Sequence, residues 1–155
     1  MMDLDELLAR GAIHDVLTRY FIGLDTRRPD LIGSCFSEDI EAVYEGVHVA
    51  SGHAALMDFF SGKKRGDFVT DLVDLQRSTH AIGNVSYDIQ GDRALTETGC
   101  LAHLIDLPGG KLRMRTRGLR YRDELRRTGE RWLICRREHI LDWSRDDDVK
   151  ICNPV

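Results

Sequence analysis

A tyrosine, an aspartate and a histidine are the residues of this sequence whose types best suit acid–base chemistry. Tyr20 and Asp25 lie in an apolar segment, and His80 stands where a strand-like pattern begins. Imidazole has an ordinary pKa of about 6.5, which suits a general base near neutral pH. A carboxylate that accepts the Nδ1 hydrogen fixes the tautomer and stabilises the imidazolium formed on proton abstraction. We therefore predict that His80 removes a proton, that Asp25 holds His80, and that Tyr20 hydrogen-bonds an oxygen that gains negative charge.

Each of these residues also has a purely structural interpretation. Asp25 could end a helix in water, and His80 could be a satisfied histidine of the core or of a strand end. Tyr20 falls on an apolar stripe, where a tyrosine is usually part of the core. Residue types alone leave both interpretations open, because unusual titratable groups mark functional sites only statistically.

The first third of the chain is predicted to be helical. A stripe at helical spacing begins with leucines and continues through larger apolar residues, namely Leu4, Leu7, Leu8, Ile13, Val16, Leu17, Tyr20, Phe21 and Leu24. This helix should end near Asp25, where residues 26–29 interrupt it. Pro29 suits the first turn of a second, short helix. A third helix is predicted over about 53–60.

The remainder of the chain is predicted to be rich in strands. Strands are expected in 39–50, around a Glu45-Gly46 turn, and then over about 78–89, 93–106, 111–127 and 131–143, separated by turns at 90–92, 107–110 and 128–130. Residues 63–67 read as a polar loop and 144–155 as an irregular tail. The alternation changes phase between Met114 and Leu119, so a β-bulge is expected near Gly118.

These elements predict an α+β fold, in which a strongly curved mixed or antiparallel sheet and three N-terminal helices close a cone-shaped pocket. The length of 155 residues fits a single domain over 1–155, with a core at about 4–143 and a tail at 144–155. An enclosed pocket of this kind is where a small molecule binds.

The composition excludes several classes of protein. A net charge of −4 argues against a nucleic-acid binder, which favours a basic face. No apolar run approaches the ~20 residues that span a bilayer, and the first residues lack the pattern of a secretory signal. The cysteines (Cys35, Cys100, Cys135 and Cys152) form no C-x-x-C pair. We expect a cytoplasmic protein with no metal and no cofactor, since a phosphate-binding glycine loop is also missing.

Three stretches carry a resemblance to a known family. They are Ile13-x-x-Val16-Leu17-x-x-Tyr20-Phe21-x-x-Leu24-Asp25, then Thr79-His80-x-x-Gly83-Asn84, and finally Tyr121-x-Asp123-x-Leu125 with the close at Asp142-Trp143. This layout resembles the SnoaL-like family of the nuclear-transport-factor-two-like (cystatin-like) superfamily. Within it, the pattern is similar to scytalone dehydratase, bile-acid 7α-dehydratase and hexachlorocyclohexane dehydrochlorinase.

The resemblance implies roles for individual residues. Asp25 and His80 match an Asp–His pair in which the histidine abstracts a proton and a leaving group departs, and Tyr20 matches the tyrosine of the dehydratases. His103 falls where a second pocket histidine could protonate a leaving hydroxyl, although it could equally face away on its strand. Arg137 matches a pocket arginine. Because strand faces alternate, only one of Arg136 and Arg137 should point inward.

The remaining predictions concern the substrate, the rival functions and the partners. Tyr44 and Phe59 are expected to line the substrate pocket. The leading function is a cofactor-independent lyase or isomerase that acts on a small, mostly apolar cyclic substrate. The alternatives are a non-catalytic ligand-binding protein and a structural partner like the small subunit of a ring-hydroxylating dioxygenase. A homo-oligomer, trimer or dimer, is expected, because a curved sheet leaves its convex face uncovered and an exposed face with Met114, Leu119 and Tyr121 nearby favours pairing.

Overall fold

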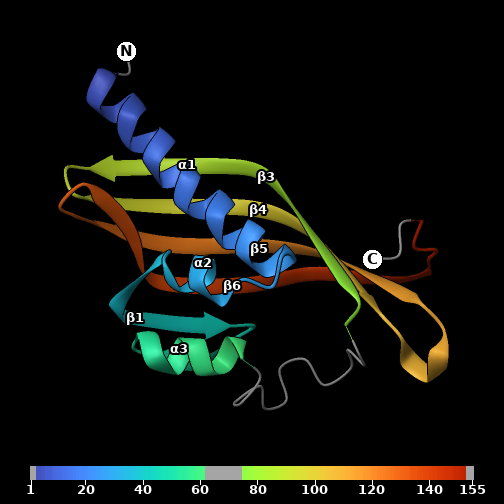
Figure 1. Ribbon diagram of the computed structural model, residues 1–155. Helices are drawn as coiled ribbons and strands as arrows, with labels where there is room; N and C mark the ends of the chain where they lie inside the picture. The colour runs from blue at the N-terminus through green and yellow to red at the C-terminus, as the bar shows by residue number, and fades with distance from the viewer. Residues whose placement is uncertain (1–2, 62–74, 153–155) are drawn as a thin grey trace.

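The computed structural model describes residues 3–61 and 75–152. In this part of the chain, helices lie across one face of a single sheet (Figure 1). The helices are α1 (Leu4–Asp25), α2 (Pro29–Gly33) and α3 (His53–Phe60). The strands are β1 (Phe36–Tyr44), β2 (Val47–Ser51), β3 (Arg77–Gln90), β4 (Arg93–Asp106), β5 (Arg113–Thr128) and β6 (Arg131–Asp148), with a short 3₁₀ turn at Pro108–Gly110. The loop predicted at 63–67 lies outside the described residues.

The six strands form one mixed sheet in the order β2-β1-β6-β5-β4-β3. β1 and β6 run parallel, and all other neighbours are antiparallel. The predicted α+β class and mixed sheet are confirmed. Figure 1 shows α1 lying diagonally over the strands, with α2 and α3 beside it and the strands continuing past the end of α1. The core lies between these helices and the inner face of the sheet.

Helix α1 buries the stripe that its sequence predicts. Asp3 caps its first turn, because the carboxylate accepts a hydrogen bond of 2.8 Å from the backbone N–H of Glu6. The inward residues from Ile13 to Phe21 are buried. The leucines of the first turns are different: Leu4, Leu7 and Leu8 are 67%, 52% and 62% exposed, because this end of α1 projects beyond the sheet (Figure 1). The buried stripe therefore begins at Ile13 rather than at Leu4.

The predicted irregularity at Gly118 exists, but the extra residue lies on the neighbouring strand. The β4–β5 pairing is continuous, so the odd residues from 113 to 125 share the inner face. The register shifts instead between β5 and β6, where Gly118 pairs with Trp143 and Leu119 pairs with Leu141. Asp142 is thus the inserted residue. The apparent change of phase arose because the inner positions from 113 to 117 are arginines, which a pattern of apolar residues misses.

A consequence of this register concerns the expected oligomer face. Leu119 and Tyr121 are only 4% and 2% exposed, because they point inward beneath the helices. Met114 lies on the opposite face. The expectation that these residues form one exposed apolar surface is therefore wrong, and association of this chain with copies of itself stays a prediction.

Strand β6 extends five residues further than predicted, to Asp148. Charge pairs across the strands account for the extension. Arg115 bonds Asp146 at 2.7 Å, and Lys111 bonds Asp148 at 2.8 Å. Opposite charges on facing strands stabilise their pairing. The polar residues after 143 therefore belong to the sheet up to Asp148 and not to an irregular tail. None of the described helices is long and apolar enough to cross a membrane.

We predict that Gly118→Ala destabilises the protein through Trp143. A Cβ added at Gly118 would lie 2.3 Å from the indole of Trp143, well inside van der Waals contact. Overpacking of this kind costs about 1–3 kcal/mol of unfolding free energy, which chemical denaturation would measure. The double variant Gly118→Ala, Trp143→Ala should lose less stability than the sum of the two single variants. Strict additivity would contradict this contact as the cause.

Candidate functional site

Asp25 and His80 meet at the end of α1. His80 follows the start of β3, and its Nδ1 lies 2.6 Å from Asp25 Oδ1. The backbone N–H of His80 donates to Asp25 Oδ2 at 2.7 Å, and Ser78 Oγ donates to Oδ1 at 2.8 Å. Because an ionised carboxylate only accepts hydrogen bonds, this geometry assigns the imidazole hydrogen to Nδ1. Nε2 is then left with its lone pair.

These hydrogen bonds also control the charge of Asp25. Burial by itself would raise the pKa of Asp25, but the hydrogen bonds from the side chain and backbone of His80, with that from Ser78, bring the pKa below its ordinary value. Phe21 stacks on the His80 ring, with centroids 5.6 Å apart and planes 20° apart. Asp25 is thus an anion, and the imidazole is held on one edge and one face.

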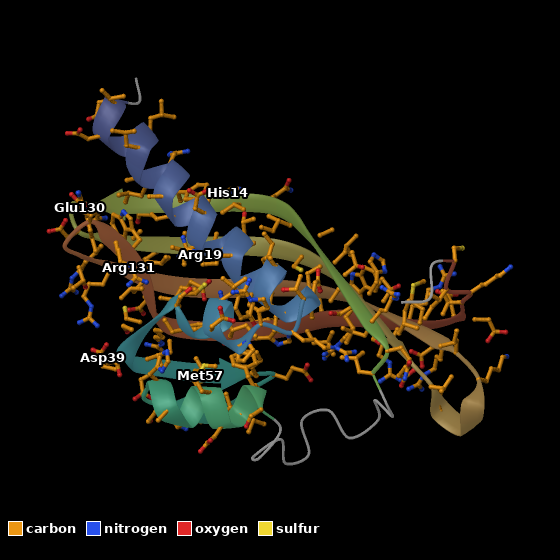
Figure 2. All side chains as sticks on the ribbon, viewed as in Figure 1. His14, Arg19, Asp39, Met57, Glu130 and Arg131 are labelled. Carbon is orange, nitrogen blue, oxygen red and sulfur yellow. The ribbon has the colours of Figure 1, made fainter. Side chains whose placement is uncertain are left out.

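His80 lines a cavity of about 550 Å³ between the helices and the inner face of the sheet. Its apolar lining consists of Leu24, Pro29, Ile32, Met57, Phe59, Phe60, Leu75 and Leu104. Figure 2 shows Met57 on α3, the helix that closes one side. The polar lining comes from Tyr20, Arg27, Tyr44, Ser61, Ser78, His80, Arg117, Tyr121 and His139. The predicted pocket residues Tyr20, Tyr44, Phe59 and His80 are therefore brought together.

Two tyrosine hydroxyls meet in this cavity. Tyr20 Oη and Tyr44 Oη are 3.1 Å apart, and both side chains are buried. Burial raises the pKa of Tyr20 well above its ordinary value and also raises that of Tyr44. Both hydroxyls therefore keep their protons at neutral pH. One hydroxyl donates to the other, and the Tyr121 ring packs against Tyr20 with ring centroids 5.9 Å apart.

Arg137 points inward, but it does not line the cavity. Its guanidinium donates to both carboxylate oxygens of Asp123, at 2.8 and 2.7 Å, and both side chains are 0% exposed. It lies 4.1 Å from the ring centroid of Tyr20 and 4.7 Å from that of Tyr121. Arg136 faces outward, with a 66% exposed side chain. Of the two arginines, Arg137 is therefore the one that points inward. It packs against the Tyr20 ring behind the cavity lining, and its contact with a substrate stays a prediction.

His103 lies away from the dyad. The inner residues of β4 include Ala102 and Leu104, and side chains alternate along a strand, so His103 points to the opposite face. Its Nδ1 lies 3.0 Å from Thr116 Oγ1. The structure therefore does not bring His103 to the cavity, and the alternative of a strand residue that faces away fits its position.

A second polar group in the cavity was not anticipated from the sequence. Arg117, on β5, forms an ion pair with Glu45 in the β1–β2 turn. His139, on β6, stacks on Tyr44 with ring centroids 4.8 Å apart. Its Nδ1 lies 3.9 Å from Glu45 Oε1. The signal that could have located Arg117 was an inner-face position on β5, which the misplaced bulge concealed.

His139 gives the fold a testable dependence on pH. Burial and the charges of Arg117 and Arg137 lower the pKa of His139 to about 3, whereas an unfolded histidine titrates near 6.5. Between these pH values the unfolded chain binds a proton that the folded chain does not, so stability falls as the pH falls. When the pH is lowered from about 6.5 to about 4, the unfolding free energy of His139→Gln should fall less than that of the wild type. Urea denaturation at each pH measures the difference. Parallel curves would contradict this.

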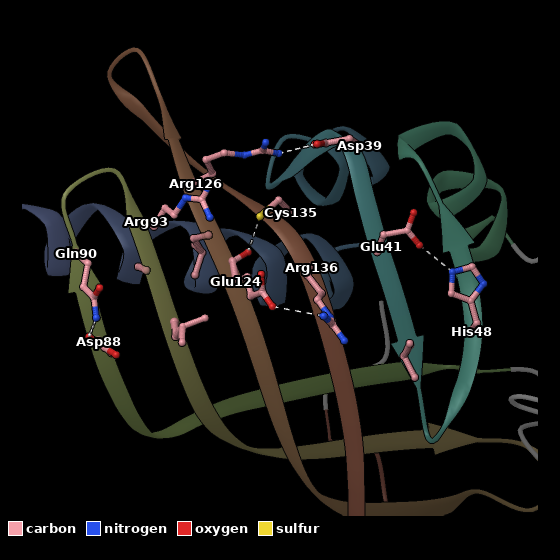
Figure 3. Close-up of a pocket in the computed structure, with 14 residues that line it drawn as sticks. Asp39, Glu41, His48, Asp88, Gln90, Arg93, Glu124, Arg126, Cys135 and Arg136 are labelled. Carbon is pink, nitrogen blue, oxygen red and sulfur yellow. Dashed lines mark hydrogen bonds and ion pairs between the residues drawn. The ribbon is translucent and has the colours of Figure 1, made fainter.

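A larger hollow, of about 800 Å³, lies on the face of the sheet opposite the helices (Figure 3). It does not contain the Asp25–His80 pair. Several of its charged side chains pair with one another, among them Arg126 with Asp39 at 2.7 Å and His48 with Glu41 at 2.9 Å. Exposed, mutually paired charges are typical of a solvated surface. The inner cavity is therefore the candidate active site.

Comparison with known proteins agrees with this architecture. Among solved structures of similar fold is hexachlorocyclohexane dehydrochlorinase LinA-type3 from Novosphingobium barchaimii LL02, with 19% identity, a TM-score of 0.80 and coverage of 99% of this chain and 100% of that one. A putative scytalone dehydratase from Novosphingobium aromaticivorans DSM 12444 shows 22% identity and a TM-score of 0.75, covering 96% of this chain and 94% of that one. No curated protein matches this chain.

The fold class is thus that of the cystatin-like α+β proteins. One such protein, from Nostoc punctiforme PCC 73102, covers 87% of this chain and 92% of its own at a TM-score of 0.68 and 17% identity. The model of the SnoaL-like domain matches residues 5–138, and the chain therefore belongs to the SnoaL-like family, as its sequence pattern indicated.

Proposed function

We propose that this protein is a cofactor-independent lyase or isomerase that abstracts a proton from a small, mostly apolar cyclic substrate. The observation that best supports this proposal is the 2.6 Å contact between Asp25 and Nδ1 of His80, a residue that lines the inner cavity. An imidazole held in this way presents Nε2 to a bound molecule. A general base in such a position accelerates proton transfer by about 10²–10⁴-fold.

The proposed reaction begins at a carbon next to a carbonyl group. Nε2 of His80 takes the C–H proton, and the C–H electron pair moves toward the carbonyl oxygen. The hydroxyl of Tyr20, which lines the cavity, donates to that oxygen as its charge grows. In an elimination, the carbonyl re-forms and a β substituent departs with its bonding electrons. In an isomerisation, the proton returns at another carbon.

Two further points support this choice over a pure binding role. Asp25 is held as an anion by hydrogen bonds, so it can stabilise the imidazolium that proton transfer creates. Solved structures of similar fold are described as a dehydrochlorinase and a putative dehydratase, both names for elimination chemistry.

The test is solvent exchange followed by ¹H NMR. A panel of cyclic ketones and cyclic β-hydroxyketones is incubated with the protein in D₂O. The proposal expects loss of the α-proton signal, or formation of an enone, faster than in buffer for at least one compound. Compounds that bind in the cavity without exchange above the buffer rate would instead indicate a ligand-binding protein.

A further inference from the structure

Arg117 is a cation in the cavity wall that the proposed chemistry leaves unassigned. Its side chain is 14% exposed and lines the cavity that His80 also lines. Arg27, another arginine of that lining, donates to the backbone carbonyls of Leu75 and Gln76, at 2.6 and 2.9 Å. Arg137 lies behind the Tyr20 ring. Arg117 is thus well placed to meet a bound molecule opposite the dyad.

Strand register fixes the position of Arg117 relative to the base. His80 pairs with Ala102 on β4, and Ala102 pairs with Arg117 on β5. The three residues form one row across adjacent strands, with their side chains on the same face. Neighbouring strands are about 4.8 Å apart, so the Cα atoms of His80 and Arg117 are separated by about 10 Å. A small ring between the two side chains would contact both.

Glu45, which pairs with Arg117, has a backbone conformation that is unfavourable for a glutamate. Glu45 and Gly46 have φ angles of 50° and 79° and join Tyr44 to Val47 in a two-residue turn. Asparagine, aspartate or glycine is the usual first residue of such a turn, because a larger side chain disfavours positive φ. The Glu45 N–H also donates to the backbone oxygen of His139 at 2.8 Å. A glutamate at this position indicates that its carboxylate is used, here against Arg117.

The charges around Arg117 favour a neutral partner over an anion. Glu45 neutralises the guanidinium, and Asp25, which is bonded to the cavity residue His80, carries a second negative charge close to the cavity. A substrate carboxylate would meet both negative charges. A carbonyl or hydroxyl oxygen would accept a charge-assisted hydrogen bond without that repulsion. The guanidinium has five N–H donors, and Glu45 engages Nη2.

We propose that Arg117, positioned by Glu45, binds a neutral oxygen acceptor of the substrate and thereby orients the ring so that its acidic C–H faces His80. This inference rests on the proposed function and narrows its substrate class. The substrate is an amphipathic ring with a carbonyl or hydroxyl oxygen at the end opposite the base. Glu45 acts as the positioning residue, because it holds the guanidinium and limits its attraction for anions.

The experiment measures binding of two probes, cyclohexanone and cyclohexanecarboxylate, by NMR titration. Arg117→Met should lower the affinity for cyclohexanone about tenfold, because a hydrogen bond from a charged donor is lost. Arg115→Met is the matched control, because Arg115 lies on the same face of β5 and pairs with Asp146 instead. It should bind cyclohexanone as the wild type does. Glu45→Gln should raise the affinity for cyclohexanecarboxylate about tenfold and change the affinity for cyclohexanone by no more than about twofold.

Wild-type affinity for cyclohexanone in folded Arg117→Met, or no detectable binding by the wild type, would overturn the inference. If Arg117→Met does not fold, the test is the ratio of the affinities of Glu45→Gln for cyclohexanecarboxylate and cyclohexanone. A ratio equal to that of the wild type would overturn the inference. Exchange of α protons is recorded in parallel with compounds of the cyclic ketone panel that carry a second oxygen, because a single oxygen cannot meet both Arg117 and the cavity tyrosines. Binding through Arg117 without exchange would reject the proposed function alone, whereas His80-dependent exchange with unaltered binding in Arg117→Met would reject this inference alone.

Discussion

His80→Asn is expected to lower the rate of proton abstraction by about 10²–10⁴-fold. The asparagine Nδ2 can take the place of the imidazole Nδ1 and still donate to Asp25, so the local hydrogen bond is kept. What is lost is Nε2, the atom that we propose takes the proton. The rate of solvent exchange into a substrate found in the panel, at saturating concentration, measures the effect.

The matched control is His103→Asn, which alters a histidine on the opposite face of the sheet, beside Thr116. This variant should exchange at the wild-type rate. Asp25→Asn should also reduce the rate, because an amide cannot stabilise the imidazolium as a carboxylate does. Equal rates in His80→Asn and wild type would remove His80 from the mechanism. A loss of rate in His103→Asn equal to that in His80→Asn would show that the assay reports general damage.

Asp123→Asn is expected to lower the free energy of unfolding by about 3–5 kcal/mol, because removing one partner of a buried ion pair leaves an uncompensated charge. Arg137 and Asp123 are both 0% exposed and share two hydrogen bonds. The guanidinium also packs against the rings of Tyr20 and Tyr121. Loss of its anchor should therefore loosen the tyrosines of the cavity. Urea denaturation at neutral pH measures the change.

Glu124→Gln is the matched control for that experiment, one residue further along β5. Its carboxylate lies 3.6 Å from Arg136, with side chains that are 50% and 66% exposed. An exposed pair of this kind contributes no more than about 1 kcal/mol. Similar losses in Asp123→Asn and Glu124→Gln would mean that the buried pair is not an anchor. Arg137→Met combined with Asp123→Leu should recover stability, since it removes both charges together.

Local patterns predicted much of the fold. The spacing from Ile13 to Phe21 predicts the buried face of α1 because one helical period governs it. The tight turns at 45–46 and 90–92 are also local. Asp25 and His80 were identified because each stands at the end of an element, and the resemblance to the SnoaL-like family favoured their pairing over the structural alternatives.

Features that depend on irregular strand pairing could not be predicted. In β6, Ile134 and Arg137 both face inward although they are three residues apart, because the register with β5 shifts between Glu124 and Leu125. Such a bulge reverses the alternation without a clear local signal. The Arg117–Glu45 pair joins residues 72 positions apart in the sequence, and only the assembled sheet brings them together.

The position of the hydrogen on the His80 ring decides whether His80 can act as a base toward the cavity. The ¹⁵N chemical shifts of the His80 ring nitrogens, from long-range ¹H–¹⁵N correlation of labelled wild-type protein at neutral pH, distinguish a protonated nitrogen from one with a lone pair. We expect a hydrogen on Nδ1, toward Asp25, and an unprotonated Nε2 whose chemical shift changes when a ligand binds in the cavity. A hydrogen on Nε2 with a bare Nδ1 would contradict it, because His80 could not then act as a base toward the cavity.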